Sequence, residues 1–157
     1  VEVYRTAINE MAADETRWSP RSRETADHSL PYVTAVGLLD GDVTPASFSA
    51  ERLSDGRIAR LMRVTKVTEE PALTARYPEH APARVSVQFA DSGRLVRECE
   101  VPAGHSGDPL TDAQVEAKFR GLFAGYGSET QGDRVLAALW GLERCADVGE
   151  LIALLRR

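Results

Sequence analysis

One histidine precedes a long apolar run in the stretch ETADHSLPYV. Imidazole is the side chain that exchanges a proton near neutral pH, so His28 is a candidate general acid or base. The apolar residues after it predict a buried helix over residues 30–39, with Pro31 in its first turn and Ser29 or Asp27 as its N-cap. The unpaired N–H groups of such a helix end favour negative charge, so a carboxylate substrate could bind beside His28.

This position sets two opposite expectations for the pKa of His28. A positive helix end disfavours imidazolium, which would lower the pKa and leave a neutral, proton-exchanging imidazole near pH 7. The carboxylate of Asp27 would act in the other direction. The alternative to an acid–base role is a structural histidine that caps the helix or bonds a backbone carbonyl.

Other candidate ligand-binding residues lie in loops. His105 belongs to the glycine-rich segment AGHSGDP, where a solvated side chain is the alternative to a functional one. Arg17, Arg21 and Arg23 could contact an anionic ligand, although an exposed basic cluster would have the same sequence. The chain contains no phosphate loop, zinc signature, nucleophile elbow or dinucleotide fingerprint.

The composition is that of a globular protein with the length of one domain. The 157 residues are 43% hydrophobic and 27% charged, which is enough for a core without disulfides or metal. A net charge of −5 argues against nucleic acid as the main partner. Cys99 and Cys145 match no metal spacing and are expected to be reduced. With no apolar run of membrane-spanning length and no signal peptide visible, we expect a cytoplasmic protein with no membrane partner.

The periodicity predicts strands and helices followed by a helical tail, an α+β class. Weaker signals suggest a strand over residues 1–6, a helix over 7–15, a helix over 53–62 and a strand over 63–69. The segment ARVSVQFADSGRLVRECEV predicts a β-hairpin with positive φ at Gly93 and with Cys99 on its core face.

Three further helices are expected in the tail. A Thr111–Gln114 capping box begins the first, Asp133 the second, and Asp147 the third. The first of these carries apolar residues at helical spacing, which predicts one buried face.

Several segments together resemble the MmgE/PrpD family, which includes 2-methylcitrate dehydratases, cis-aconitate decarboxylases and iminodisuccinate epimerases. The longest is ETADHSLPYVTAVGLLDG, and the DSG hairpin and GHSGDPLTDAQVEAKF follow in the family's order. The resemblance implies an α+β domain over residues 1–104. It also implies that residues 105–157 return to a separate all-helical domain, built mostly from a part of the family's chain that this sequence does not contain. We therefore expect a piece or subunit of a longer enzyme.

The resemblance further implies an active site between two domains, with His28 as its catalytic residue. Asp27, Ser29, Arg23 and His105 are the expected substrate-binding residues. The implied reaction is metal-independent and cofactor-free acid–base chemistry on a small di- or tricarboxylate, by a lyase or an isomerase. The isolated chain would be inactive without its N-terminal helical domain or subunit, and an oligomer, homomeric or heteromeric, is expected. The alternative is a non-catalytic binding or assembly module that retains the fold.

The tail helices are expected to bury apolar faces against that absent domain, and so to make the isolated chain self-associate. The residues involved are Phe119, Phe123, Leu139, Trp140, Leu151 and Leu155.

Overall fold

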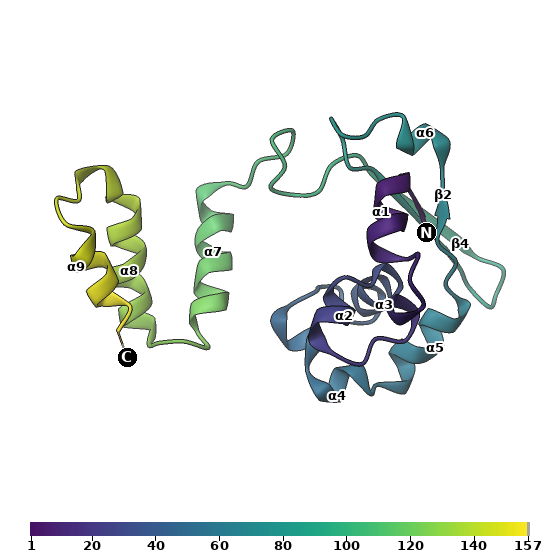
Figure 1. The fold of residues 1–157 in the computed structure, drawn as a ribbon, viewed down its shortest axis with the longest axis horizontal. Helices are drawn as coiled ribbons and strands as arrows, with labels where there is room; N and C mark the ends of the chain where they lie inside the picture. The colour runs from purple at the N-terminus through teal and green to yellow at the C-terminus, as the bar shows by residue number, and fades with distance from the viewer. Residues whose placement is uncertain (157) are drawn as a thin grey trace. The chain divides into compact units, whose positions relative to one another are not determined.

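The chain forms two compact units in the computed structural model, which describes residues 1–156 (Figure 1). The first unit runs from Val1 to Pro102, and the second begins at Ala103. The first unit contains all the named strands, and the second is built from helices. The α+β class is therefore confirmed, and the division between the units lies two residues before the boundary expected at residue 104.

The first unit is organised around a four-stranded mixed sheet with the order β2-β1-β3-β4. β1 pairs in parallel with β2 and antiparallel with β3, and β3 pairs antiparallel with β4. The strands are β1 (Glu2–Val3), β2 (Thr68–Glu69), β3 (Ala83–Gln88) and β4 (Arg94–Cys99). The strands expected over residues 1–6 and 63–69 are thus much shorter, because helices occupy part of both segments.

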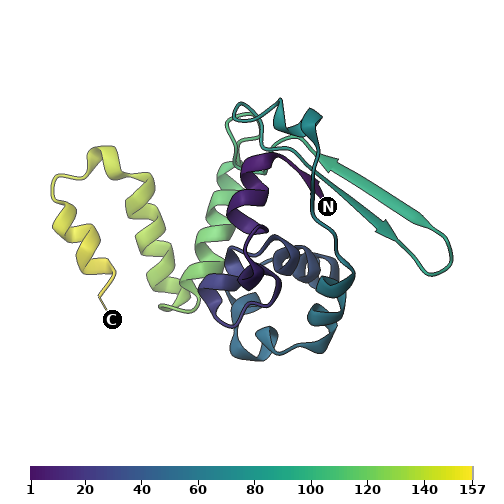
Figure 2. The same cartoon turned by 45° about the vertical axis from the view of Figure 1, so that its right-hand side comes forward.

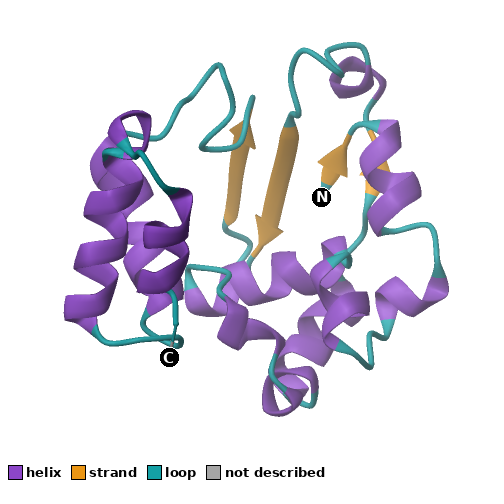
Figure 3. Ribbon diagram, turned by 60° about the vertical axis from the view of Figure 1, so that its left-hand side comes forward, coloured by secondary structure: helices purple, strands orange, loops and turns teal. Residues whose placement is uncertain are grey.

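Short helices connect these strands and gather beside and below the sheet in Figure 3. They are α1 (Arg5–Met11), η1 (Glu15–Trp18), α2 (Arg23–Asp27), α3 (Leu30–Asp40), η2 (Pro45–Phe48), α4 (Ala50–Leu53), α5 (Gly56–Val64) and α6 (Pro71–Thr74). The helix expected over residues 53–62 is divided into α4 and α5, because the Asp55 side chain caps a new helix by accepting from the Arg57 N–H.

α3 is the central helix of this unit, and its limits agree with the prediction. Ser29 is its N-cap, Pro31 lies in its first turn, and Gly41 ends it with a φ of 77°. Only part of the helix surface is buried, since Leu38 and Leu39 are exposed. The expectation of a buried helix is therefore met on the face that carries Tyr32, Ala35 and Val36, and not at Leu38 and Leu39.

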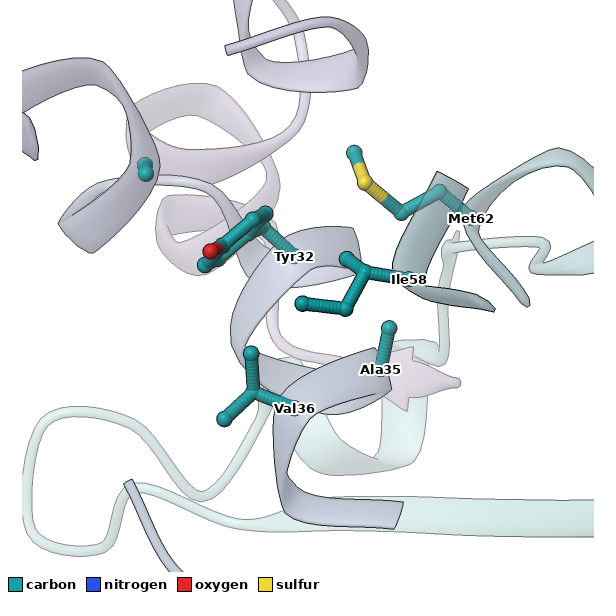
Figure 4. Packing of buried hydrophobic residues seen from close by; sticks show 6 residues of the cluster. Tyr32, Ala35, Val36, Ile58 and Met62 are labelled. Carbon is teal, nitrogen blue, oxygen red and sulfur yellow. The ribbon is translucent and has the colours of Figure 1, made fainter. Parts of the chain in front are cut away.

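The main core lies between α3 and α5, where side chains from the two helices point toward one another (Figure 4). The cluster consists of Ala26, Tyr32, Ala35, Val36, Ile58 and Met62. Burying a large apolar side chain contributes about 1.5–3 kcal/mol, so this cluster is the main reason that the α2–α3 junction is held in one place.

The predicted hairpin forms between β3 and β4, but two details differ. The residue with positive φ is Ser92, at 70°, and not Gly93. Cys99 is exposed and donates its thiol to the Val101 carbonyl, so its expected place on a core face is wrong. The reason is that β4 is an edge strand whose residues are all exposed. Both cysteines are free, as predicted.

The second unit contains α7 (Asp112–Phe123), α8 (Glu129–Trp140), η3 (Leu142–Arg144) and α9 (Val148–Leu154). The Thr111–Gln114 capping box and the Asp147 cap are confirmed. The start expected for α8 at Asp133 is wrong, because Ser128, five residues before Asp133, caps the helix by accepting from the Gln131 N–H.

The apolar residues of this unit divide into two groups. Phe123 is buried against Gly132 of α8, so it belongs to the unit's own interior and is not free to contact another domain. The exposed group includes Leu122, Leu139, Trp140, Val148 and Ile152. No helix among residues 1–156 combines the length and apolar character needed to cross a membrane.

Candidate functional site

The candidate site is the junction between α2 and α3, where two helices meet with only two residues between them. Ser22 and Thr25 form a capping box that begins α2, and His28 is the C-cap that ends it. Ser29 then caps the start of α3. His28 is therefore next to the end of one helix as well as the start of another, and the sequence had indicated only the second.

The imidazole of His28 is held at one nitrogen and open at the other. Nδ1 lies 2.5 Å from Oδ1 of Asp27 and 3.0 Å from the Glu24 carbonyl oxygen. The side chain is 61% exposed, and no other residue in the described part of the chain makes a hydrogen bond to Nε2. With Nδ1–H donating to these two acceptors, Nε2 is the nitrogen that can exchange a proton with a ligand.

The surroundings raise the pKa of His28 above its ordinary value. The Glu24 carbonyl contributes most, followed by the hydrogen bond and the charge of Asp27, while the charge of Arg17 acts against them. The lowered pKa expected from the α3 helix end is therefore wrong, and the opposite influence of Asp27 is confirmed. The physical reason is that His28 ends α2, where unpaired carbonyl groups favour a protonated imidazole.

Ser29 is fully buried, and its hydroxyl is used inside the protein. It donates to the Arg17 carbonyl and accepts from the Tyr32 N–H at 3.2 Å. Tyr32 in turn donates its hydroxyl to the Ser47 carbonyl at 2.7 Å. These bonds tie η1, the start of α3 and η2 together, so they fix the position from which His28 extends.

The sequence indicated Arg17 only as one of three arginines that could contact an anionic ligand, and did not place it at this junction. It is half-buried, and its Nε atom is buried without a hydrogen-bond partner. Its charge acts on His28, which places a cation close to the imidazole. The only sequence signal was its membership of the basic cluster with Arg21 and Arg23, both of which are exposed.

The structure groups some of the expected site residues and separates others. Asp27, His28 and Ser29 lie at one junction, and Arg23 is exposed in the first turn of α2. His105 belongs to the second unit, in a loop where it bridges to Asp108 and accepts a hydrogen bond from the Gly107 N–H at 3.0 Å.

Two surface depressions lie close to the junction, and His28 lines neither. One, of about 390 Å³, lies between the Trp18–Pro20 turn and α5, with Tyr32 in its wall. The other, of about 380 Å³, is lined by Glu15, Thr16, Ser19, Arg21, Ser22 and Thr25. The imidazole thus faces solvent in this unit, so any closed pocket around it needs a second surface.

Among residues 1–156, no three His, Cys, Asp or Glu side chains gather closely enough to hold an ion. The groups that can do chemistry here are an imidazole, carboxylates and guanidiniums.

The fold and the junction define an α+β domain that exposes a carboxylate-supported histidine. The family model for the MmgE/PrpD C-terminal domain matches residues 1–143. The chain belongs to the MmgE/PrpD family, as the sequence segments indicated.

Curated relatives carry the names of two lyases. Cis-aconitate decarboxylase of Mus musculus is 26% identical over 101 residues, which is 64% of this chain and 20% of that protein. 2-Methylcitrate dehydratase of Salmonella typhimurium is 36% identical over 87 residues, or 51% of this chain and 18% of that protein. Human cis-aconitate decarboxylase is 27% identical over 143 residues, or 87% of this chain and 28% of that protein. The chain spans less than a third of each of these relatives.

Proposed function

We propose that this chain is the C-terminal portion or subunit of a lyase or isomerase that moves a proton on a small di- or tricarboxylate. The observation that carries the proposal is the exposed imidazole of His28, held by Asp27 at 2.5 Å with Nε2 open. Relatives named as a dehydratase and a decarboxylase of tricarboxylates support the substrate class.

In this mechanism Nε2 of neutral His28 removes the proton on the carbon next to a substrate carboxylate. The Asp27 carboxylate and the Glu24 carbonyl stabilise the imidazolium that forms. For dehydration, the electron pair forms a carbon–carbon double bond as hydroxide leaves, and the imidazolium proton completes the water. For decarboxylation the reaction begins with protonated His28 and no proton is removed first. Carbon dioxide leaves, the electron pair of the broken carbon–carbon bond stays on the substrate, and the imidazolium protonates the resulting carbanion, which returns His28 to its neutral form. For epimerisation, His28 keeps the proton that it removed, and an acid supplied by the partner domain protonates the carbanion on its other face.

Cationic side chains near His28 suit the charge of such a substrate. Arg17 is half-buried at the junction and its charge acts on His28, so its guanidinium would pair with a substrate carboxylate bound beside the imidazole. Arg23 is exposed on the first turn of α2 and is available for a second carboxylate. Ser29, with its hydroxyl already used, serves by holding the start of α3 in position.

A partner domain is part of the proposal. His28 lines neither depression next to the junction, and the second unit exposes apolar side chains of α7, α8 and α9. An N-terminal helical domain or subunit, which we expect in the cytoplasm together with this chain, would cover both surfaces and supply the remaining substrate contacts. The isolated chain would then be inactive.

The second candidate is a binding or assembly module without catalysis. It is favoured by the same observation that His28 faces solvent, since an imidazole outside a pocket cannot exclude water from a reaction. The two candidates differ in whether His28 affects turnover.

The test uses the complete protein, in which this chain is combined with its helical partner, and supplies cis-aconitate and 2-methylcitrate in separate assays. His28→Gln should lower turnover by about 10²–10⁴-fold, because glutamine keeps hydrogen bonding but cannot exchange a proton near pH 7. His80→Gln is the matched control, since His80 is an exposed histidine that pairs with Glu100. Full turnover in His28→Gln would reject the acid–base role, and turnover of neither substrate by the unaltered protein would favour the binding module.

A further inference from the structure

β4 is an edge strand that is exposed on both faces and ends the sheet without a neighbour on its outer side. Its six residues are all exposed, including Leu95 at 42% and Val96 at 39%. In Figure 2 the β3–β4 hairpin extends beyond the helices of the first unit. An exposed edge of this kind presents a row of unpaired backbone groups to another chain.

The hydrogen-bond alternation shows which groups those are. The Val1 and Val3 carbonyls accept from Thr68 and Glu70 of the β2 segment, so Glu2 directs its backbone groups toward β3, where it pairs with Arg84. Antiparallel ladders alternate, so the backbone groups of Arg84 point toward β1 and not toward β4.

The same alternation continues into β4. Arg84 is opposite Glu98, so this pair is not hydrogen-bonded, and the backbone groups of Glu98 point outward. Arg94 and Val96 share that direction because they are two and four residues away. The hairpin end agrees, since the Phe89 N–H donates to the Gly93 carbonyl at 2.8 Å. Among residues 1–156, the outward Val96 carbonyl accepts a hydrogen bond from the neighbouring Arg97 side chain alone, at 3.1 Å.

We propose that the outer edge of β4 pairs antiparallel with β4 of a second copy of this chain, about a twofold axis at Val96. In this register Val96 faces its own counterpart, and Arg94 faces Glu98 of the other copy. The residues that would exchange backbone hydrogen bonds across the axis are Arg94, Val96 and Glu98, whose N–H and C=O groups point away from β3.

Charge selects this register over its neighbours. A twofold axis at Arg94, Arg97 or Glu98 would place like charges directly opposite one another, which is destabilising in a sheet. An axis at Val96 instead brings the basic beginning of each strand against the acidic end of the other. It also places the aliphatic stem of each Arg97 over Leu95 of the other copy, on the face of the sheet nearest α3.

The side chains on the other face complete the match. Glu2, Glu98 and Glu100 pair with two guanidiniums, those of Arg76 and Arg84, and Glu100 also contacts the His80 imidazole. When that imidazole is neutral, the cluster has one carboxylate more than it has cations. Arg94 bonds the Ser86 hydroxyl and forms no ion pair with any residue in the described chain. Pairing two copies would bring each unpaired Arg94 to the other copy's cluster.

The experiment is disulfide trapping in the full chain with Cys99→Ser and Cys145→Ser in the background. Paired residues in an antiparallel ladder have Cα atoms about 5.5 Å apart, within reach of a disulfide. Val96→Cys should therefore give a covalent dimer of twice 17.1 kDa under mild oxidation. Arg94→Cys is the matched control, because two copies of residue 94 would lie about 14 Å apart and cannot be bridged.

A second variant tests the backbone pairing itself. Val96→Pro removes an N–H that points away from β3, so the hairpin should keep its melting temperature while the native mass falls to that of a monomer. Equal trapping of Val96→Cys and Arg94→Cys would indicate association through another surface and would overturn the proposal. Trapping at Arg97→Cys in preference to Val96→Cys, or a native monomer in the unaltered chain at micromolar concentration, would overturn it as well.

Discussion

Nδ1 of His28 lies 2.5 Å from Oδ1 of Asp27, the residue immediately before it, at the point where α2 ends. Adjacent side chains rarely meet in this way inside a helix, because neighbouring residues point in different directions. The C-cap backbone of His28, with φ of −99° and ψ of 15°, lies outside the regular helix and allows the contact. The raised pKa of His28 thus depends partly on where α2 stops.

Asp27→Asn should lower the pKa of His28 toward its ordinary value, because it removes the charge and weakens the hydrogen bond of the partner. The Glu24 carbonyl remains, so part of the elevation should persist. An NMR titration of the imidazole protons measures this directly. Glu24→Gln is the control, since it keeps the carbonyl that contacts the ring. An unchanged pKa in Asp27→Asn would contradict the pairing.

The same pair gives a pH dependence of stability with a defined sign. The pKa of His28 in the folded chain is raised above its unfolded value of about 6.5. Protonated His28 therefore stabilises the fold fully below about pH 6.5, and this stabilisation is lost as the pH rises through the folded pKa. The melting temperatures of the unaltered chain and of Asp27→Asn should therefore differ more at pH 6 than at pH 9. The effect of Asp27→Asn in a His28→Gln background is subtracted at each pH, so that only the part that depends on His28 remains. A difference that grows toward alkaline pH would be inconsistent with this linkage.

Ser29→Ala should destabilise the first unit by about 0.5–2 kcal/mol, because it removes the N-cap of α3 and a bond to the Arg17 carbonyl. Tyr32→Phe should cost about 1–3 kcal/mol, since it leaves the buried Ser47 carbonyl without its donor. Urea unfolding measures both. Ser54→Ala serves as the control, because its exposed hydroxyl only bonds back to a carbonyl in its own helix. Equal effects for all three variants would contradict the structural role of Ser29.

A pair of glycine substitutions tests the packing of the second unit. A Cβ on Gly132 would lie 3.1 Å from Cδ1 of buried Phe123, whereas a Cβ on Gly121 would meet no atom within 4 Å. Alanine in a helix is favoured over glycine by about 1 kcal/mol. Gly121→Ala should therefore raise the melting temperature, and Gly132→Ala should lose that gain by displacing the Phe123 ring. Equal stabilisation by both variants would mean that α7 and α8 can move apart, and so make room for the new Cβ, at no cost in stability.

Exposed apolar side chains of the second unit should make the isolated chain bind a hydrophobic dye. Leu122 and Ile152 are 54% and 52% exposed, so replacing both with glutamine should reduce dye binding and raise solubility. Val64→Gln is the comparison, since Val64 is an exposed single residue of the first unit. If the unaltered chain does not bind the dye, these residues do not form a contiguous exposed apolar surface.

Local signals in the sequence determined the helix caps and the hairpin. Thr111 and Asp147 were identified, and Ser29 was one of two candidates with Asp27, because a cap is a contact between residues two or three apart, which the sequence displays directly. The segments that resemble the MmgE/PrpD family could also be recognised from the sequence, because each is a continuous motif. The predicted start of α8 was wrong because Ser128 directly follows Gly125 and Gly127, so the sequence suggested a turn there and not a helix cap.

Only the tertiary structure decided the surroundings of individual side chains, such as those of His28, Cys99 and Arg17. The five-residue helix α2 has too few residues for a periodic signal, yet its end sets the direction of the His28 pKa. The exposure of Cys99 depends on β4 being at the sheet edge, which follows from strand order and not from the alternation within the strand. Arg17 became a site residue through the hydrogen bond that its carbonyl accepts from Ser29 and through the effect of its charge on His28, both across eleven or more positions in the chain. Periodicity describes which face of an element is apolar, but the neighbours of that face are chosen by packing between elements distant in sequence.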